Sequence, residues 1–360
     1  MKKILIVNPF GIGDVLFTTP VVRAIKESNP DTFIGYWCNE RAQDILKDNP
    51  NINKIFALSR GDLKKIYHKS VWQGIRNFLN LLYGIKKEKF DIVLDFSLDH
   101  RYSLLAKISG IRKRVGFNYK KRGRFLTDKI DIDGYSDKHM VEYYLDLLKP
   151  IGIIPKSFSL ELVVPQESNV RARRILAEYG INESDLIIGI APGAGASWGA
   201  DAYLKHWPAI KFGELADRIA NDFNAKIIML ADKSEGPIVE AIVKSMRTKP
   251  IDLSGKITLA ELSAIINNLQ ILIANDGGPL HIAAALGKKT ISFFGPVDPK
   301  VYGPYPYDEN RHIVLRKSLK CSPCYVNFRL LKCIRNRECI ETIDVDSAMN
   351  AVVKLLQGKG

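Results

Sequence analysis

The chain contains a junction whose residue types suit the binding of a phosphate group. The apolar run 271–274 predicts a buried strand, and Asp276, Gly277 and Gly278 separate it from an alanine-rich helix. Ligands of open α/β sheets bind where the strands end. A helix start presents free backbone N–H groups and a partial positive charge, and glycines let an anion approach the backbone closely. The junction therefore predicts a site for a nucleotide diphosphate.

Three further side chains extend this predicted site. His281 lies one turn into the same helix, where it either donates a hydrogen bond to a phosphate or sugar hydroxyl or packs as part of the helix end. The glycine-rich loop 192–197 follows another predicted strand and can fold its N–H groups into an anion nest, to which Ser197 adds a hydroxyl. Lys205 precedes a helix that we expect near Pro208, and it is either a point charge for a diphosphate or an ordinary surface lysine.

A third loop follows the first predicted strand and has the sequence Gly11-Ile12-Gly13-Asp14-Val15-Leu16. It begins like the dinucleotide-binding fingerprint G-x-G-x-x-G, but Leu16 occupies the third glycine position, which argues against a nicotinamide site. Asp14 is expected at a helix start, where its carboxylate either caps the helix or acts as a general base. A transfer reaction needs such a base to take the proton from an acceptor hydroxyl.

Strand-like and helix-like segments alternate along the chain, which predicts parallel βαβ units and an α/β fold. In the first half, strands are expected at 3–8, 32–38, 54–58, 91–96 and, as a further candidate, 114–117, and helices at 14–28, 42–48, 73–87, 100–109 and 139–148. In the second half, strands are expected at 187–191, 225–230, 271–274, 289–294 and 312–315, and helices at 209–222, 236–245, 259–267, 280–286 and 344–356. Two Rossmann-like halves therefore follow one another, with a boundary near residues 151–164.

The net charge of +14 over 360 residues points to an anionic partner. Much of the excess in the first half lies between Arg112 and Arg124, and it is either a solvated basic face or a site for an anionic acceptor or membrane surface. The chain carries no recognisable nucleic-acid module, so we do not expect nucleic acid to be the partner. It has no apolar run long enough to span a membrane, and its first residues resemble a strand more than a signal peptide, so we expect a cytoplasmic protein.

Two patterns in the chain are associated with metals. Cys38 is expected in the core, whereas four cysteines form a group near the end of the chain: Cys321, Cys324, Cys333 and Cys339. A C-x2-C pair can begin a zinc or iron–sulfur site, but this spacing fits no standard finger and no histidine accompanies it, which favours a structural or unligated cluster. Residues 131–133 and 344–346 match a short D-x-D pattern, but neither follows a strong core strand. We therefore predict no metal site.

In combination, three blocks of the chain resemble glycosyltransferase family 9, the heptosyltransferases of lipopolysaccharide core assembly. The blocks are residues 11–20, Lys205-His206-Trp207-Pro208, and residues 275–281 running into 294–299. The resemblance implies a GT-B fold, with two facing Rossmann-like domains and a last helix that crosses back to the first. In this chain it implies an acceptor-binding domain at 1–160, a nucleotide-sugar-binding domain at 161–342 and a C-terminal helix within 343–360.

The resemblance also implies an activity. It is the inverting transfer of a heptose or related sugar from an ADP-sugar to an anionic lipopolysaccharide core acceptor. In the family the donor is ADP-L-glycero-β-D-manno-heptose. The resemblance implies that the reaction needs no metal and no cofactor. Asp14 is the implied base, and Lys205 would neutralise the departing diphosphate. The residues implied for the donor are Gly193, Ser197, Asp276, Gly277, Gly278, His281 and Glu235, with Asp232 as the alternative to Glu235 for the ribose. The residues that we expect to bind the acceptor are Gly13, Arg114, Lys120 and Arg122.

The segment 71–83 is apolar and aromatic, and it is either in contact with the inner leaflet of the membrane or a buried helix. We expect a monomer at the cytoplasmic face of that membrane. Three alternatives remain open from the sequence. The first is a transferase that uses another nucleotide sugar for a different surface glycan. The second is a nucleotide-dependent epimerase or dehydrogenase, and the third is an inactive relative that only binds a nucleotide sugar.

Overall fold

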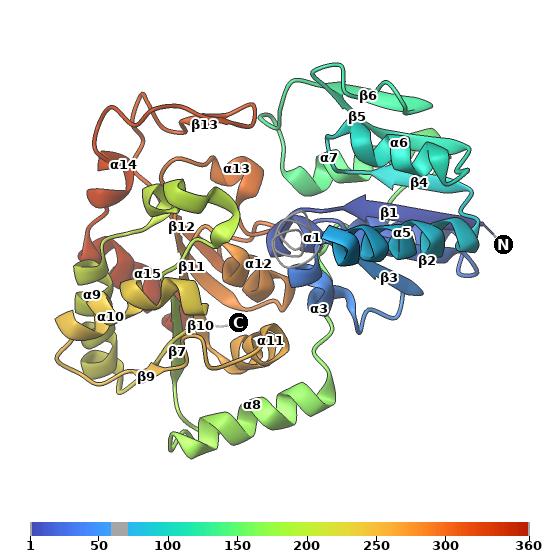
Figure 1. Cartoon of the computed structure of the whole chain (residues 1–360). Helices are drawn as coiled ribbons and strands as arrows, with labels where there is room; N and C mark the ends of the chain where they lie inside the picture. The colour runs from blue at the N-terminus through green and yellow to red at the C-terminus, as the bar shows by residue number, and fades with distance from the viewer. Residues whose placement is uncertain (1, 59–70, 359–360) are drawn as a thin grey trace. The chain divides into compact units, whose positions relative to one another are not determined.

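The computed structural model describes residues 2–58 and 71–358, with the backbone but not the side chains of residues 71, 196 and 197. The chain divides into two compact units, Met1–Val163 (the N-terminal unit) and Val164–Gly360 (the C-terminal unit). Figure 1 labels their helices and strands. None of the helices in the described ranges combines the length and the apolar character needed to cross a membrane.

The N-terminal unit is built on a parallel sheet with the strand order β3-β2-β1-β4-β5-β6 (Figure 1). Its strands are β1 (Lys3–Asn8), β2 (Phe33–Cys38), β3 (Lys54–Ala57), β4 (Ile92–Asp95), β5 (Lys113–Tyr119) and β6 (Asp128–Ile132). Its helices are α1 (Ile12–Leu16), α2 (Thr19–Ser28), α3 (Gln43–Leu46), α5 (Val71–Glu88), α6 (His100–Ile108) and α7 (Met140–Asp146). Because all six strands are parallel, the loops after β1, β4 and β5 lie at one edge of the sheet.

The C-terminal unit repeats this architecture with the strand order β12-β11-β10-β7-β8-β9, again parallel. Its strands are β7 (Ile187–Ala191), β8 (Lys226–Met229), β9 (Ile251–Asp252), β10 (Ile271–Asn275), β11 (Lys289–Phe293) and β12 (His312–Leu315), followed by the hairpin β13 (Tyr325–Val326) and β14 (Arg329–Leu330). Its helices are α8 (Gln166–Glu178), α9 (Ala209–Phe223), α10 (Gly236–Ser245), α11 (Leu259–Asn268), α12 (Gly278–Ala285), α13 (Pro299–Tyr302), α14 (Glu338–Glu341) and α15 (Val345–Gln357).

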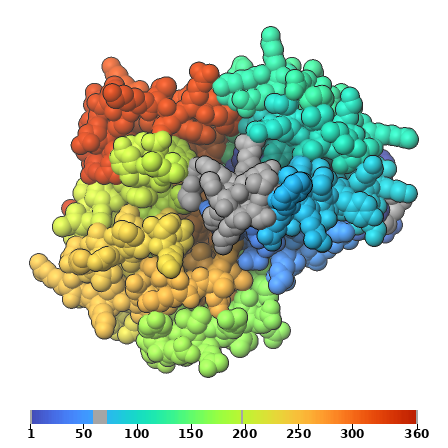
Figure 2. Space-filling view, viewed as in Figure 1, coloured from blue at the N-terminus to red at the C-terminus, as the bar shows by residue number. Residues whose placement is uncertain are grey.

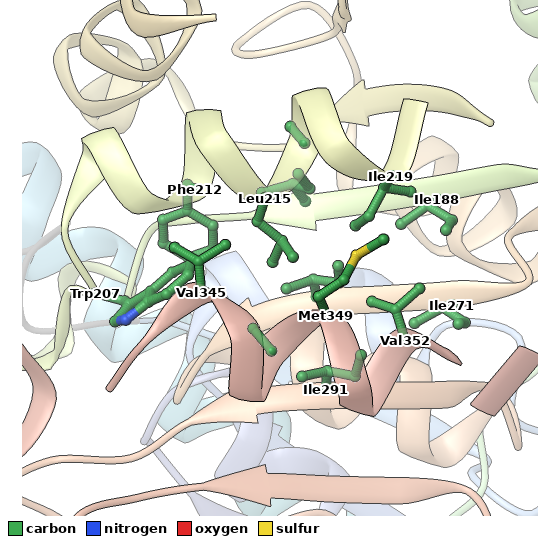
Figure 3. Close-up of a cluster of buried hydrophobic side chains, with 14 of the residues drawn as sticks. Ile188, Trp207, Phe212, Leu215, Ile219, Ile271, Ile291, Val345, Met349 and Val352 are labelled. Carbon is green, nitrogen blue, oxygen red and sulfur yellow. The ribbon is translucent and has the colours of Figure 1, made fainter. Parts of the chain in front are cut away.

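A single apolar core joins one face of the second sheet to α9 and α15. Figure 3 shows Phe212, Leu215 and Ile219 of α9 pointing towards Met349 and Val352 of α15, and the strand residues Ile188, Ile271 and Ile291 belong to the same cluster. The apolar side of α15 lies on this sheet of its own unit, and the expected contact of this last helix with the N-terminal domain stays a prediction. Apolar residues recur every three or four positions along 345–355, so they line one side of helix α15.

Other elements differ from the sequence-based expectations. The single helix expected at 14–28 is two helices, α1 and α2, because Pro20 lies in the first turn of α2 and Thr18 is its N-cap. Edge strand β6 and helix α8 were not predicted. The candidate strand 114–117 is confirmed as β5, and it extends from Lys113 to Tyr119. The segment 151–164, where we expected the boundary, contains the division between the two units.

Candidate functional site

The core of the C-terminal unit holds Lys205 in place. Two residues after it, Trp207 is fully buried and stacks on Phe293 of β11, with ring centroids 4.0 Å apart. The backbone N–H of Trp207 donates a hydrogen bond to Asn275 Oδ1 at 3.1 Å. Because Asn275 ends β10 directly before Asp276, this bond links the two segments that carry Lys205 and Asp276.

Lys205 and Asp276 form a buried ion pair. Lys205 Nζ lies 2.6 Å from Asp276 Oδ2, and His281 Nε2 lies 3.8 Å from Asp276 Oδ1. Burial alone raises the pKa of Asp276, but Lys205 and His281 outweigh it and lower that pKa to about 2. The structure thus brings together three residues that we predicted for the donor site. It also excludes the alternative that Lys205 is an ordinary surface lysine, because its side chain is 8% exposed.

Aromatic side chains border this ion pair. Lys205 Nζ lies 4.3 Å from the centre of the Trp198 ring, a cation–π distance. Trp198 in turn packs on Tyr325 of β13, with ring centroids 5.1 Å apart. Sequence analysis did not single out these two aromatic residues, although Trp198 directly follows the glycine-rich loop. The side chain of Ser197, which we predicted for the donor, lies outside the described residues.

A carboxylate of the protein occupies the glycine-rich loop that we expected to bind an anion. Glu235 Oε1 accepts a hydrogen bond from the Gly195 N–H at 3.0 Å, and Glu235 Oε2 accepts one from the Asp232 N–H at 3.2 Å. Burial raises the pKa of Glu235, and these N–H donors partly oppose it. A Cβ atom on Gly193 would lie 1.9 Å from Glu235 Oε1. Glu235 therefore holds the loop in shape, and Gly193 leaves the space for its carboxylate.

The two glycine-containing loops are in contact. A Cβ atom on Gly277 would lie 3.4 Å from the backbone of Ala194, so the loop after β7 packs against the start of α12. Gly277 is the N-cap of α12, and Gly278 is its first residue. The helix start, Glu235 and the Lys205–Asp276 pair therefore lie at the same edge of the second sheet, as the strand-end rule predicts.

In the N-terminal unit, Asp14 lies in the first turn of α1 and not at its N-cap, which is Gly11. Its carboxylate accepts a hydrogen bond from the Gly11 N–H at 3.2 Å, so it does help to cap the helix. Asn8 is fully buried, and its Nδ2 atom donates to the Asp14 carbonyl at 2.9 Å. Its Oδ1 atom accepts a hydrogen bond from the Phe10 N–H at 3.2 Å. Asn8, which sequence analysis missed, thus sets the shape of the loop that carries Gly13 and Asp14.

A second acid lies at this edge of the first sheet. Asp95 ends β4 beside Val7 of β1, is 5% exposed, and accepts a hydrogen bond from the Ser97 N–H at 2.9 Å. Burial raises its pKa to about 6, and the hydrogen bonds from Ser97 only partly oppose that rise. Sequence analysis missed Asp95, although the same strand-end argument that selected Asp276 applies to the predicted strand 91–96.

The basic residues predicted for the acceptor have two different surroundings. The Arg114 guanidinium donates to the carbonyls of Phe125 and Ile111, each at 2.6 Å, and so holds the chain around β5. Lys120 and Arg122 are exposed in the turn after β5, and both lie against the ring of Tyr119, at 4.8 and 6.0 Å from its centre. The edge that carries Asp14 therefore also carries exposed cations.

Two of the late cysteines, Cys324 and Cys339, lie against the loop after β11. The Cys324 N–H donates to the Pro296 carbonyl at 3.0 Å, and a Cβ atom on Gly295 would lie 3.2 Å from Cys339 Sγ. All five cysteines are free thiols. Burial, and then the neighbouring cysteines, raise the pKa of Cys339 to about 11. In the part of the chain that the structure describes, no group of three or more His, Cys, Asp or Glu side chains is placed to hold a metal ion.

Comparison with known proteins identifies the family. The family model of glycosyltransferase family 9 (heptosyltransferase) matches residues 78–335, well over half of the chain. The chain belongs to glycosyltransferase family 9. This confirms the resemblance on which we based the site predictions, and the residues discussed above are those of a family 9 glycosyltransferase.

Lipopolysaccharide heptosyltransferases are among the proteins to which this family 9 chain is similar. Lipopolysaccharide heptosyltransferase 3 of Escherichia coli is 27% identical over 300 residues, which are 81% of this chain and 83% of the relative. Among solved structures, the glycosyl transferase family 9 protein from Veillonella parvula DSM 2008 is 26% identical, with a TM-score of 0.83 over 99% of this chain and 98% of that one. The E. coli heptosyltransferase WaaC with ADP is 16% identical, with a TM-score of 0.72 over 98% and 99%. These similarities and the two parallel sheets confirm the predicted α/β fold of GT-B type.

Proposed function

We propose that this family 9 protein transfers a heptose or a closely related sugar from an ADP-sugar to a lipopolysaccharide core acceptor. The observation that carries the proposal is the buried Lys205–Asp276 pair beside a helix start and a glycine-rich loop. A lysine held there can offset the charge that develops on a departing diphosphate. The heptosyltransferases among its relatives support the choice of sugar, and the structure of E. coli WaaC with bound ADP supports the choice of nucleotide.

At the donor end, we assign the diphosphate to Lys205 and to the start of α12 at Gly277 and Gly278. His281, one turn into α12, is assigned to the diphosphate or to a hydroxyl of the transferred sugar. Glu235, with Gly193 beside it, is assigned to the ribose, because its partly buried carboxylate retains lone pairs for sugar hydroxyls. Ser197 completes the proposed donor set.

At the acceptor end, we assign the general base to Asp14, in the loop that also contains Gly13. The exposed Lys120 and Arg122 are assigned to the acidic groups of the acceptor, because phosphates and carboxylates on a lipopolysaccharide core require cations. Arg114 stays in this proposed set, and its hydrogen bonds to backbone carbonyls suggest that it acts by holding β5 and its turn. The assignment places the acceptor on the N-terminal unit and the donor on the C-terminal unit.

The proposed reaction is a direct displacement with inversion at the anomeric carbon. The acceptor oxygen forms a bond to that carbon on one side while the bond to the ADP oxygen breaks on the other. The proton of the acceptor hydroxyl goes to the Asp14 carboxylate, and the bonding electron pair leaves with ADP. Lys205 and the α12 start stabilise the negative charge on ADP, so that the proposed step requires no metal ion.

Isothermal titration calorimetry with ADP, UDP, GDP and CMP tests the donor assignment. We expect ADP to bind most tightly, and we expect Lys205→Ala to weaken its binding. A preference for UDP would favour the alternative in which the enzyme uses another nucleotide sugar for a different surface glycan. We further propose that the enzyme is a monomer and acts at the cytoplasmic face of the inner membrane, where its acceptor is anchored.

A further inference from the structure

The outer side of helix α5 exposes large apolar side chains in a continuous stripe. Trp72 is 82% exposed, Ile75 37%, Leu79 57% and Tyr83 68%. Their spacings of three, four and four residues place them on one side of a helix. We call these four residues the α5 stripe. Figure 2 shows α5, in sky blue, at the surface of the molecule.

The α5 stripe is separate from the residues that fold the unit. The opposite side of α5 supplies Ile85, which is buried, and Leu81 and Leu82, which are partly buried, to the core on the first sheet. Phe56 and Phe90 belong to the same core. The fold therefore already uses one apolar side of α5, and the outer stripe has no part in that core.

Cations accompany the α5 stripe. Arg76, Lys86 and Lys87 are exposed, and helical spacing places them on the same side as Trp72 and Tyr83. Within the described residues, none of these three cations pairs with a carboxylate. The acidic residue of this helix, Glu88, projects elsewhere and bonds to Lys3 at 3.2 Å and to Lys54 at 2.8 Å.

The neighbouring helix continues this character. Helix α6 packs on the same core as α5, through Tyr102, Leu105 and Ala106, so the two helices cover the same face of the sheet. It exposes Ile108, which is 63% exposed, next to the exposed Lys107. The N-terminal unit has 28 lysine and arginine residues against 18 aspartate and glutamate residues, a surplus of ten within the net charge of +14.

We propose that the α5 stripe is a docking face for an anionic phospholipid bilayer. An interfacial helix inserts apolar and aromatic side chains below the headgroups while lysine and arginine remain at the headgroup level. The α5 stripe with Arg76, Lys86 and Lys87 matches this arrangement, and Glu88, the acidic residue of α5, pairs with Lys3 and Lys54 rather than facing the lipid surface. This proposal rests on the proposed function for one point, the choice of the membrane. Lipid binding itself involves neither ADP nor the acceptor.

A second copy of the chain fits this face less well than a bilayer. Two copies that met through their α5 stripes would bring six like charges together. Four apolar side chains from each copy also provide little of the roughly 1,200 Å² or more that a specific interface buries. A bilayer, by contrast, satisfies both the apolar side chains and the cations.

Co-sedimentation of the full chain with vesicles tests the proposal. We expect binding to phosphatidylglycerol vesicles, weaker binding to phosphatidylcholine vesicles, and a loss of about tenfold or more in partitioning for Trp72→Ser/Leu79→Ser. The matched control is Val170→Ser/Ile210→Ser, which removes apolar side chains of similar exposure, 61% and 68%, from the C-terminal unit. This control should bind like the wild type.

A second readout locates the contact. Brominated lipid chains should quench the fluorescence of the bound wild type, and Trp72→Phe should bind equally while losing most of that quenching. Equal vesicle binding by the wild type and Trp72→Ser/Leu79→Ser would overturn the proposal, as would the absence of binding. So would dimers in light scattering that this double substitution converts to monomers. ADP titrations of the same variants keep the outcomes distinct, because loss of lipid binding with normal ADP affinity leaves the proposed transfer intact.

Discussion

Lys205 and Asp276, 71 residues apart in the sequence, meet in a buried pair with 2.6 Å between Nζ and Oδ2. The pair joins the segment after the glycine-rich loop to the segment that begins α12. It therefore supports the shape of the proposed donor site as well as its charge. A buried pair of this kind makes the two residues depend on each other, since either one alone is an uncompensated buried charge.

Lys205→Met should therefore destabilise the C-terminal unit by about 3–5 kcal/mol, because Asp276 keeps a buried charge without its main partner. Lys205→Met/Asp276→Asn should recover much of that loss while remaining defective in ADP binding. Thermal unfolding gives the stabilities, and calorimetry gives the ADP affinity. Additive losses in the double variant would show that the two side chains act independently.

Gly193 and Glu235 should act as one unit. In Gly193→Ala, the new methyl group meets the Glu235 carboxylate, which must leave its bonds to the loop N–H groups. We expect Gly193→Ala and Glu235→Ala each to weaken ADP binding by about tenfold, and the double variant to be no weaker than the poorer single variant. Gly236→Ala is the control for a change in this region, because its Cβ atom would meet no atom within 4 Å and its backbone is already helical. Independent, additive effects would contradict the proposed support of the loop by Glu235.

Asp95 should make the stability of the N-terminal unit depend on pH. Its folded pKa, raised by burial to about 6, exceeds the ordinary value of 3.8, so stability is lost as pH rises from about 4 to about 6. Above that window the loss amounts to up to about 3 kcal/mol. Asp95→Asn should therefore stabilise the protein at pH 7.5 and change little at pH 4. Urea unfolding at both pH values measures this, and equal effects at the two values would show that Asp95 does not titrate in this way.

The exposed Lys120 and Arg122 should affect acceptor binding, whereas Arg114, which bonds to backbone carbonyls, should affect stability. Lys120→Ala/Arg122→Ala should raise KM for the acceptor, make it less sensitive to salt, and leave the ADP affinity unchanged. Arg114→Met should instead lower the unfolding temperature, because it removes the donor from three backbone carbonyls, those of Phe125, Ile111 and Arg112. Lys226→Ala/Lys249→Ala, exposed lysines of the C-terminal unit, is the control for the loss of charge. An unchanged acceptor KM in the first variant would remove these residues from the acceptor site.

The sequence was sufficient to predict the elements that position the site. Parallel strands give long apolar runs, so β1, β7 and β12 were predicted with their observed bounds. Short loops after such strands directed attention to Asp14, Gly193 and Asp276. The edge strand β6 escaped prediction because three of its five residues are charged and none of them is buried. Helix α8, which begins directly after Pro165, was not predicted either.

The sequence could not supply the partners of those residues. Whether Lys205 is exposed or paired depends on where Trp207 packs and on a hydrogen bond to Asn275, which lies 68 residues away. The position of Glu235 in the glycine-rich loop likewise depends on its hydrogen bond to Gly195, which lies 40 residues away in the sequence. Asp95 needed no such contact, since it lies next to the end of the predicted strand 91–96, and a consistent search around strand ends would have found it.

The central claim is that Asp14 takes the proton from the acceptor, and Asp14→Asn tests it most directly. Asparagine retains an oxygen that can accept the Gly11 N–H, so α1 should remain capped and only the basicity is lost. In one preparation, calorimetry measures ADP affinity and release of ADP from the sugar donor measures transfer. We predict an unchanged ADP affinity and a fall in kcat of about 100-fold or more. Turnover at the wild-type rate would contradict the account.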